Sequence, residues 1–438
     1  MKLAPDPTGD DTVNPKDQDL PRRRFLRSGL AAGAALGAAQ AVRAAPSDVA
    51  AMSKADPMHV VEPFYGPHQG GIVTPQQSHA YLASLDLVTE KRDELIGLLR
   101  TWTEASARMA RGATAKPLPR SDTDIAPDSA DALGLGPAGL TITFGFGPGM
   151  FISNGKDRYG LARYRPEALV DLPRFNGEQL LAQKTGGDIL IQACANDPQV
   201  AFHAVRQLAR MGDGAVQMRW GQAGFLSGPR GQTPRNLMGF KDGTNNPSIA
   251  KPALMNQFVW AKGADAPWMH GGTYTVVRRI RITIEHWDQM KVGFQEQVFG
   301  RQKYSGAPIG KKNEFDPLDL DATDKDGNPL IPENAHVRLS NDSMNNGAQI
   351  LRRSYAYNDS TDFYIERWPP WRQETEYDAG LIFIAHQGDP RTGFIPINER
   401  LSRFDMLNQF TTHVGSAIFA CPPGAAEGSF IGAGLFRT

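Results

Sequence analysis

Apolar residues between positions 95 and 220 switch repeatedly between the spacing of a helix and the spacing of a strand. GLTITFGFG (139–147) alternates and then breaks at glycines, and DILIQACA (188–195) is a continuous apolar run. Both segments are typical of β-strands. Before them, apolar residues recur at helical intervals and predict a helix: Leu95, Leu98, Leu99 and Trp102. Such a mixture buries both kinds of apolar face when helices pack against a sheet.

A second helix and a further strand continue this pattern. Asp197 followed by Pro198 is a common helix start, because aspartate caps the first free amides and proline fits the first turn. AVQMRW (215–220) returns to the spacing of a strand. The apolar stripe of the predicted helix consists of Val200, Ala204, Val205 and Leu208. We interpret the succession as strand, helix, strand, strand, helix, strand, which is the ferredoxin-like order.

The second half of the chain repeats the same logic. TYTVVRRIRITI (273–284) alternates, and QILRRSYAY (349–357) and GLIFIAHQ (380–387) also predict strands. FDMLNQFTTHV (404–414) predicts a helix, and SAIFACP (416–422) predicts the last strand. We therefore expect an α+β fold class with two ferredoxin-like domains, each an antiparallel sheet with helices packed on it.

The N-terminal residues carry the pattern of an export signal. PRRRFLR (21–27) is basic and precedes a weakly apolar run, and VRA (42–44) has the form of a small-residue cleavage site. The apolar run is too short to cross a bilayer, so we expect no membrane span in the mature chain. The RRxFL pattern within residues 21–27 resembles the twin-arginine export motif, which implies export of a folded protein to the periplasm.

These patterns divide the chain into four parts. Its 438 residues are enough for two domains with sizeable cores. We place the boundary between the domains near residues 228–235, and we find no sequence repeat between the two halves. The predicted parts are a twin-arginine signal peptide at 1–44, a flexible leader at 45–60, an N-terminal domain at 61–230 and a C-terminal domain at 231–438.

The charge balance and the cysteines exclude several classes of function. The chain has 47 basic and 47 acidic residues, so no basic excess points to nucleic acid or to an anionic membrane surface. Cys194 and Cys421 belong to neither a CxxC nor a CxxCH pattern, which argues against a zinc ribbon, a thiol redox motif and covalently attached haem. Two buried thiols are the favoured interpretation, and a single disulfide stays open.

Residues 239–247, GFKDGTNNP, form a loop in which Asp242 has two interpretations. Asp-Gly is a favoured turn dipeptide, so a plain turn explains the aspartate. A carboxylate held in place by such a loop can instead act as an acid or a base. The spacing of the loop alone supports both interpretations about equally.

GFKDGTNNP is one of several segments that form an ordered set. The others are FYGPHQGGIVTPQQ (64–77), FGRQKYSGAPIG (299–310), HVRLSN (336–341), ILRRSYAY (350–357) and SAIFACPPGA (416–425). In this order they resemble the motifs of the dye-decolourising (DyP-type) haem peroxidases, whose GxxDG motif matches GFKDG. The resemblance covers nearly the whole mature chain. Together with the twin-arginine pattern, it points to the deferrochelatase/peroxidase branch of that family.

The resemblance implies one non-covalently bound haem b per chain, held in the C-terminal domain. It implies that His336 is the axial ligand of the haem iron and that Asp405 accepts a hydrogen bond from this histidine, which raises its basicity. On the peroxide side, the family places a proton shuttle at Asp242 and a fixed cation at Arg352. Adjacent strand residues face opposite ways, so only one of Arg352 and Arg353 can point at the haem, and the family pattern selects Arg352.

The resemblance also implies further contacts with the haem. Arg301 is expected beside a propionate, and Leu381 and Phe383 are expected in the apolar wall of the distal pocket. This chain reads NDS at 341–343, where the relatives carry Asn-Pro-Arg-like residues. The remaining contacts that the resemblance implies are Gly243, Thr244, Asn245, Asn341, Asp342 and Ser343.

Bulky donors cannot reach a buried iron, so we expect electrons to leave through tryptophan or tyrosine at the surface. Residue type alone makes several tryptophans candidates for this role. They are Trp260, Trp268, Trp287, Trp368 and Trp371.

The sequence thus predicts a haem-dependent peroxidase that uses hydrogen peroxide to oxidise organic donors. The branch it resembles implies a second activity, the release of iron from haem with the porphyrin left intact (deferrochelatase). The same site would also serve an alternative, a non-catalytic periplasmic haem-binding or iron-delivery protein. Partnership with an iron-uptake system and a homodimer are further expectations from the resemblance, and no nucleic-acid partner is expected.

Overall fold

The structure of the chain is a computed structural model. It describes residues 56–119, 125–228, 231–361, 365–368, 371–374 and 377–437, the side chains of 365–368 and 371–374 excepted. The predicted signal peptide at 1–44 lies outside these residues, as does the predicted leader up to residue 55.

The first half forms the ferredoxin-like arrangement that the apolar patterns predict. Its strands are antiparallel and lie side by side in the order β4-β1-β3-β2. The patterns locate every element except β1, because the leucines of its HAYLASLDL run do not keep the two-residue spacing of a half-buried strand. The elements are β1 (His79–Leu87), α1 (Arg92–Met109), β2 (Thr141–Phe146), β3 (Ile189–Ala195), α2 (Pro198–Met211) and β4 (Val216–Phe225).

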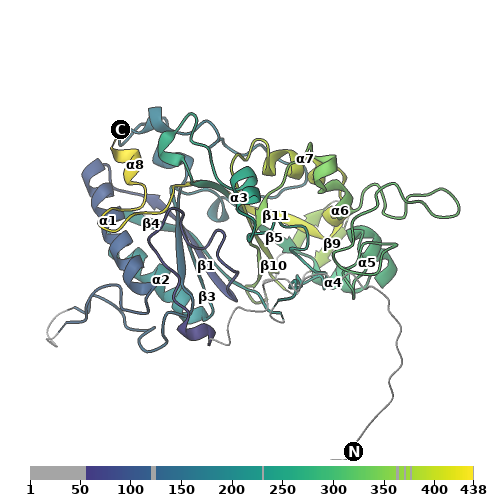
Figure 1. Cartoon of the computed structure of the whole chain (residues 1–438), viewed down its shortest axis with the longest axis horizontal. Coiled ribbons are helices and arrows are strands. Elements are labelled where there is room, and N and C mark those ends of the chain that lie inside the picture. The colour runs from purple at the N-terminus through teal and green to yellow at the C-terminus, as the bar shows by residue number, and fades with distance from the viewer. Residues whose placement is uncertain are drawn as a thin grey trace, which may run out of the picture. The chain divides into compact units, whose positions relative to one another are not determined.

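Helices α1 and α2 lie next to each other beside this sheet (Figure 1). Their predicted apolar stripes are all buried. The carboxylate of Asp197 accepts hydrogen bonds from the amides of Gln199 and Val200 at 2.8 and 2.9 Å, which confirms the predicted cap of α2. The indole of Trp102 in α1 donates to the carbonyl of Leu208 in α2 at 2.7 Å, and this bond ties the two helices together.

The second half has the same strand order, β11-β5-β10-β7, again antiparallel. The short strand β6 pairs with β10 as well. The strands are β5 (Thr273–Ile282), β6 (Leu351–Arg352), β7 (Tyr355–Asn358), β10 (Ala379–Gln387) and β11 (Thr411–Cys421). The helices are α3 (Pro252–Phe258), α4 (Ile284–Asp288), α5 (Val292–Phe299), α6 (His336–Leu339), α7 (Phe394–Phe404) and α8 (Ala433–Phe436).

The sheets of the two halves join edge to edge. β4 meets β7 at Phe225 and Ala356, and β2 meets β11 at Phe146 and Ala420. Because β5 also pairs with β10, these eight strands form a closed ring of neighbours. A ring leaves few open strand edges, and its interior side chains form one of the buried apolar clusters of the core.

The buried cysteine thiols belong to this core. Cys194 and Cys421 are both free and buried, which confirms the favoured interpretation and excludes a disulfide between them. Burial raises the pKa of Cys421 to about 12, against a smaller opposite effect of the hydrogen bond with Thr275. The Cys421 thiol is therefore protonated and unreactive at neutral pH.

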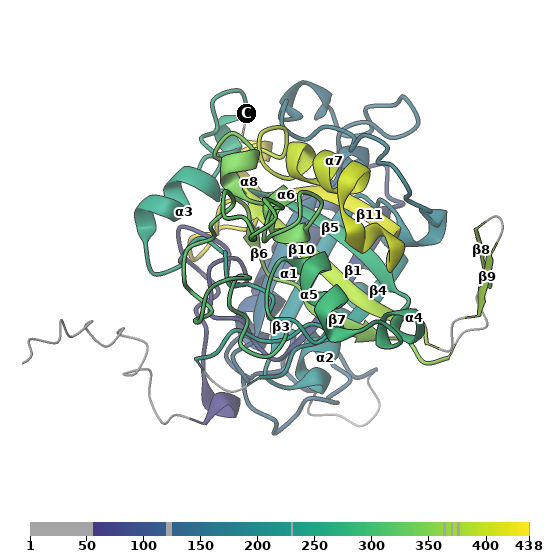
Figure 2. The same ribbon diagram turned by 90° about the vertical axis from the view of Figure 1, so that its right-hand side faces the viewer.

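A two-stranded sheet, β8 (Ile365–Trp368) and β9 (Trp371–Glu374), is separate from the ring. Figure 2 shows this hairpin standing away from the other strands. Within the described residues, none of the helices combines the length and the apolarity that crossing a membrane requires.

The segment 404–414 is not the helix that its spacing predicts. Helix α7 ends at Phe404, Asp405 caps the short 3₁₀ helix η8 (Met406–Gln409), and β11 begins at Thr411. The prediction is wrong because the threonines at the end of this segment pair with the end of β5, and β-branched residues suit a strand. The correction places Asp405 between two helices rather than inside one.

The segment 349–357 also differs from its prediction as one strand. It forms the two strands β6 and β7, interrupted at Arg353 and Ser354. The amide of Arg353 still donates to the carbonyl of Ile384 in β10 at 2.8 Å, so the whole segment stays beside β10.

Candidate active site

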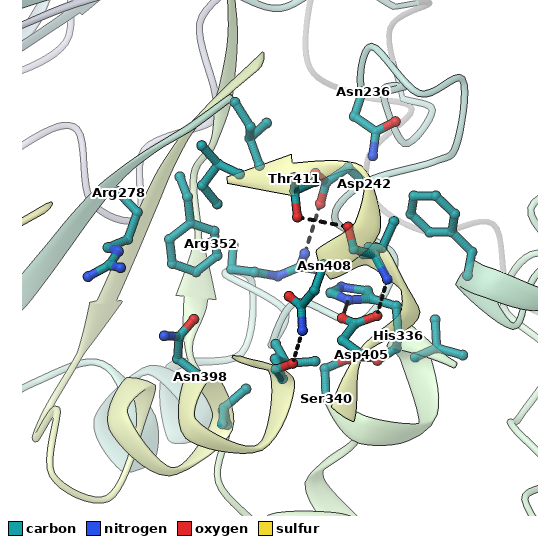
Figure 3. A pocket seen from close by; sticks show the side chains of 18 of the residues that line it. Asn236, Asp242, Arg278, His336, Ser340, Arg352, Asn398, Asp405, Asn408 and Thr411 are labelled. Atoms are coloured by element: carbon teal, nitrogen blue, oxygen red, sulfur yellow. Dashed lines mark hydrogen bonds and ion pairs between the residues drawn. The ribbon is translucent and has the colours of Figure 1, made fainter. Parts of the chain in front are cut away.

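A cavity of about 640 Å³ lies beside the sheet of the second half. Strands β5 and β10 supply one part of its wall, and helices α6 and α7 supply another. The loop 236–245 and the segment 175–179 of the first half also line it. Its lining is predominantly apolar and includes Leu381 and Phe383 on β10, the two residues expected in an apolar wall. Figure 3 shows the polar side chains that reach into this cavity.

Asp242 and Arg352 form an ion pair in the cavity, although they lie 110 positions apart in the chain. Nη1 of Arg352 donates to Oδ1 of Asp242 at 2.8 Å. The side chain of Arg352 is 26% exposed and that of Asp242 is 19% exposed, so the pair is shielded from bulk solvent yet accessible to a small molecule. Figure 3 shows the guanidinium extended towards the aspartate.

The loop that carries Asp242 is fixed to the strand that carries Arg352. The side-chain amide of Asn246 donates to the carbonyl of Arg352 at 2.8 Å and accepts from its amide at 3.2 Å. The amide of Asp242 donates to the carbonyl of Pro234 at 2.9 Å. Gly243 has φ +121°, a backbone conformation that other residues rarely adopt. Sequence reasoning missed Asn246, whose two bonds would be recognisable only once β6 is known to lie beside the loop.

Arg353 points away from the cavity. Its side chain is buried and donates to the carbonyls of Thr74 and Pro75 and to the side chain of Gln77. Of the two adjacent arginines, Arg352 is therefore the one that lines the cavity, as the alternation of strand residues requires.

His336 and Asp405 form a second polar pair in the same cavity. Nδ1 of His336 lies 2.6 Å from Oδ2 of Asp405. The carboxylate is 4% exposed and the imidazole 28% exposed. A carboxylate only accepts, so Nδ1 carries the proton and Nε2 keeps its lone pair for a ligand. Asp405 also accepts from the amide of Leu407 at 2.9 Å, which fixes the carboxylate as the cap of η8.

Arg301 and the NDS segment lie at the border between this cavity and a neighbouring one of about 430 Å³. Arg301 lines both cavities, and its Nη1 donates to the carbonyls of Gly306 and Glu314 at 2.8 and 2.9 Å. Asp342 lines the larger cavity, whereas Asn341 and Ser343 line only the neighbouring one and bond to each other. Among the expected contacts in the loop of Asp242, Gly243 lines the larger cavity, and Thr244 and Asn245 line both.

A buried cluster that sequence reasoning missed lies elsewhere on the cavity wall. Arg278 in β5 donates to Glu178, to the ring of His413 at 3.0 Å and to Ser416 at 2.7 Å. Burial lowers the pKa of His413 to about 3, and the positive charge of Arg278 adds to this effect. His413 is therefore neutral and accepts from Arg278. Burial also lowers the pKa of Arg278, although Glu178 opposes the shift.

A smaller cavity of about 300 Å³ also borders the Asp242–Arg352 pair. It shares these two residues, Asn236, Gly243 and Leu381 with the larger cavity, and its other lining residues include Gln76, Ser354 and the segment 231–235. The ion pair is thus reachable from two cavities.

Three of the tryptophans expected to carry electrons at the surface are buried instead. Trp260, Trp268 and Trp287 are 6%, 6% and 1% exposed. The prediction is wrong for these three because indole rings are large and apolar and fill the core. The side chains of Trp368 and Trp371 lie outside the described residues.

The residues of the larger cavity fit a haem. A planar apolar macrocycle needs apolar walls, which β5, β10 and α7 supply. Its iron needs an imidazole with one nitrogen free and the other held, and His336 with Asp405 is such an arrangement. Its propionates need fixed cations, and Arg301 lies on the wall.

Two family models match this chain over most of its length. The model described as "Dyp-type peroxidase, N-terminal" matches residues 69–226, and "Dyp-type peroxidase, C-terminal" matches residues 233–426. The chain is 40% identical to "Dye-decolorizing peroxidase" of Thermobifida fusca over 386 residues, 84% of each protein. It is 33% identical to "Deferrochelatase" of Yersinia pestis over 441 aligned residues, 97% of this chain and 96% of the relative.

Solved structures agree with the sequence matches. "Ferric DtpA from Streptomyces lividans" is similar with a TM-score of 0.78 and 37% identity, over 87% of this chain and 98% of that one. A DyP-type peroxidase from Streptomyces coelicolor has a TM-score of 0.78 and 36% identity, over 90% and 100% of the two chains. These findings assign to the chain a non-covalently bound haem and an oxidoreductase activity that acts on peroxide. The chain belongs to the Dyp-type peroxidase family.

Proposed function

We propose that this chain is a haem-dependent peroxidase in which His336 holds the iron and the Asp242–Arg352 pair handles peroxide. One observation carries the assignment of roles: a single cavity contains both a carboxylate-backed imidazole and a carboxylate–guanidinium pair. When bound, haem iron supplies the redox chemistry that cleaves the peroxide bond. The residues described below bind and orient the reactants and move the proton.

His336 is proposed as the residue that would hold the haem iron, through Nε2. Asp405 holds the proton on Nδ1 at 2.6 Å and so fixes both the tautomer and the plane of the ring. The negative charge of Asp405 gives the imidazole partial imidazolate character, which makes it a stronger donor to the metal. Since Asp405 is also held by the amide of Leu407, the carboxylate cannot easily turn away from the ring.

Asp242 is proposed as the group that moves the proton. Peroxide loses a proton from one oxygen and gains one on the other as its bond breaks, and a carboxylate within reach of both atoms can carry it. Arg352 stays protonated throughout and stabilises the negative charge that develops on the departing oxygen. The 2.8 Å bond between Arg352 and Asp242 fixes the direction in which the carboxylate points.

The other cavity residues are proposed to bind the haem and keep out water. Arg301, on the cavity wall, would pair with a propionate, and Leu381 and Phe383 would supply part of the apolar wall. In the Asp242 loop, Gly243, Thr244 and Asn245 are proposed to bring the backbone close to the haem. Asp342 is proposed as a further haem contact because it lines the larger cavity, whereas Asn341 and Ser343 line only the neighbouring cavity. The 300 Å³ cavity also borders Asp242, and it is proposed as a place where hydrogen peroxide approaches this residue.

Two reactions are proposed for this site. The first is peroxide-dependent oxidation of an organic donor, which the 40% identity with a dye-decolorizing peroxidase supports. The second is release of iron from haem with the porphyrin intact, which the relatives named Deferrochelatase support. Purified protein is incubated with haem, with and without hydrogen peroxide and a dye. Bleaching of the dye only with peroxide supports the first reaction, and the fluorescence of metal-free porphyrin supports the second.

A matched variant tests the assignment of the ligand. His336→Ala removes the imidazole and leaves Asp242 and Arg352 in place. We expect it to lose the Soret absorption of bound haem or to shift it, with loss of both reactions. A Soret band identical to that of the wild-type protein would contradict the assignment of His336.

We also propose that the protein works in the periplasm after export by the twin-arginine pathway. The RRxFL pattern and the VRA cleavage site support this proposal. Replacement of Arg22 and Arg23 by lysine is expected to keep the protein in the cytoplasmic fraction. Partnership with an iron-uptake system and a homodimer stay predictions from the family resemblance.

A further inference from the structure

Glu314 joins both sides of the loop that carries Asp242. Oε2 of its carboxylate accepts a hydrogen bond from the ammonium of Lys241, and Oε1 accepts one from the hydroxyl of Thr244 at 2.9 Å. Lys241 immediately precedes Asp242, and Thr244 immediately follows Gly243. Glu314 itself lies on the segment between α5 and α6, about 70 positions away from the loop. One carboxylate therefore spans the turn that presents the aspartate to the cavity.

The environment of Glu314 is that of a fixed internal anion. Its side chain is 9% exposed, and Lys241 is 14% exposed. Burial alone raises the pKa of Glu314, but the hydrogen bonds from Lys241, Thr233 and Thr244 outweigh it, so the pKa lies below its ordinary value. A largely buried carboxylate with several donors keeps its geometry better than an exposed ion pair, because solvent competes less for the same contacts.

The main chain of Glu314 also contacts Arg301, the cation that is expected beside a haem propionate. The carbonyl of Glu314 accepts from Nη1 of Arg301 at 2.9 Å. The side chain thus holds the Asp242 loop, and the backbone holds Arg301. A substitution of the side chain leaves the carbonyl in place, so the two functions are separable by mutation.

We propose that Glu314 is a positioning residue that fixes Asp242 for the reaction with peroxide by clamping Lys241 and Thr244. Without the clamp, the turn at Gly243 loses the two side-chain bonds that flank it and keeps the main-chain bond of Asp242 to Pro234, the ion pair of Asp242 with Arg352 and the contacts of Asn246. A glycine at this position makes the turn easy to deform. Neutralisation of Lys241 by Glu314 also leaves Arg352 as the cation that pairs with Asp242. The chemical consequence of the clamp rests on the role proposed above for Asp242.

Hydrogen exchange on the haem-free protein tests the clamp without any turnover. We expect amides in residues 236–250 to exchange faster in Glu314→Ala than in the wild-type chain, and Glu314→Gln to lie between them. Asp319→Asn is the matched control, because Asp319 lies on the same segment but forms an exposed ion pair with Lys311 at 3.2 Å. Unchanged exchange in both Glu314 variants overturns the proposal.

The reaction with peroxide tests the consequence on the haem-loaded protein. We expect Glu314→Ala to slow the bimolecular reaction by about 10- to 100-fold, the size expected when a catalytic group is misplaced by about 1 Å. Its haem affinity should stay within about twofold of the wild-type value. Lys241→Met combined with Glu314→Gln should be no slower than Glu314→Gln alone, because both changes remove the same contact. Additive losses overturn the proposal.

Asp242→Asn in the same series separates the two proposals. If Asp242→Asn reacts as fast as the wild-type protein, the proposed role of Asp242 fails, and the exchange result still decides whether Glu314 holds the loop. If Asp242→Asn is slow while both Glu314 variants react at the wild-type rate, the clamp has no effect on the chemistry and the inference is overturned.

Discussion

Nδ1 of His336 lies 2.6 Å from Oδ2 of Asp405, which is 69 positions further along the chain. The histidine begins α6, and the aspartate occupies the junction between α7 and η8. The carboxylate of Asp405 therefore makes two contacts at once: it caps η8 and it bonds to the imidazole of His336. A replacement that loses either contact is expected to move the proposed iron ligand.

Asp405→Asn tests this partnership. Asparagine is also a good cap, so the junction between α7 and η8 should keep its structure. The amide lacks the negative charge, so His336 becomes a weaker donor, and we expect haem affinity to fall by about 10- to 100-fold. Haem transfer to apomyoglobin measures the affinity, and a potentiometric titration should show a more positive midpoint potential of the iron. An unchanged affinity and potential would show that Asp405 does not act through His336.

Arg352→Met should slow the reaction with peroxide and spare the binding of haem. Methionine has a similar length but no charge, so the developing negative charge on the departing oxygen loses its fixed cation. We expect a loss of about 100- to 1,000-fold, as for the removal of one transition-state donor. Stopped-flow absorption at the Soret band gives the rate constant. Arg353→Met serves as a comparison, because its side chain points away from the cavity. An equal loss of rate in both variants would count against a specific role of Arg352.

Acid should destabilise the haem-free protein through His413. In the unfolded chain this histidine binds a proton near pH 6.5, whereas in the fold its pKa is about 3 because of burial and of Arg278. Unfolding therefore takes up a proton between these two pH values, and the free energy of unfolding falls as the pH falls through this window. Buried His386, whose pKa is also about 3, contributes in the same direction.

His413→Gln is expected to flatten this dependence on pH. Glutamine keeps an acceptor for Nε of Arg278 but does not titrate. Thermal unfolding of the two proteins between pH 4 and pH 8 measures the change in slope (a range chosen to cover most of the window). His59→Gln, a change at an exposed histidine, is the control. Identical slopes for the wild-type protein and His413→Gln would refute the assignment of His413.

Arg278→Met should destabilise the fold through Glu178. The arginine is 1% exposed and the glutamate 6% exposed, and their ion pair joins β5 of the second half to the segment 175–179 of the first. Removal of the cation leaves a buried carboxylate without its partner, which costs about 3–5 kcal/mol. Chemical denaturation measures the loss. The double variant Arg278→Met with Glu178→Gln should recover part of the stability, and a larger loss than in the single variant would argue against this account.

The sequence predicted the parts of the fold that depend on local periodicity. The stripes of α1 and α2 follow from side-chain spacing, which reports which face is buried, and the cap at Asp197 follows from residue type. The alternation of β5 located the strand, but both of its faces are buried, so the spacing did not report its burial. The sequence did not predict β1, whose leucines at Leu82, Leu85 and Leu87 do not keep the two-residue spacing of a strand. It also failed at 404–414, where pairing with β5 decides the conformation of threonines that a local pattern had assigned to a helix.

The candidate site was predicted by resemblance rather than by spacing. His336, Asp405, Asp242 and Arg352 lie far apart in sequence, and no local pattern pairs them. Their partners in the structure, such as Asn246 and Glu314, were missed for the same reason, since their contacts exist only after the fold has formed. The tryptophans show the converse error, in which residue type suggested the surface and packing placed Trp287 in the core.

The reaction of Asp242→Asn with hydrogen peroxide tests the central claim most directly. Ferric, haem-loaded protein is mixed with peroxide, and the Soret band is followed by stopped flow at equal haem content. Asparagine keeps the size of the side chain but cannot take up the proton, so we predict a rate constant lower by about 100-fold or more, with haem binding unchanged. A rate constant equal to that of the wild-type protein would contradict the account and would leave Asp242 as a turn residue of GFKDGTNNP.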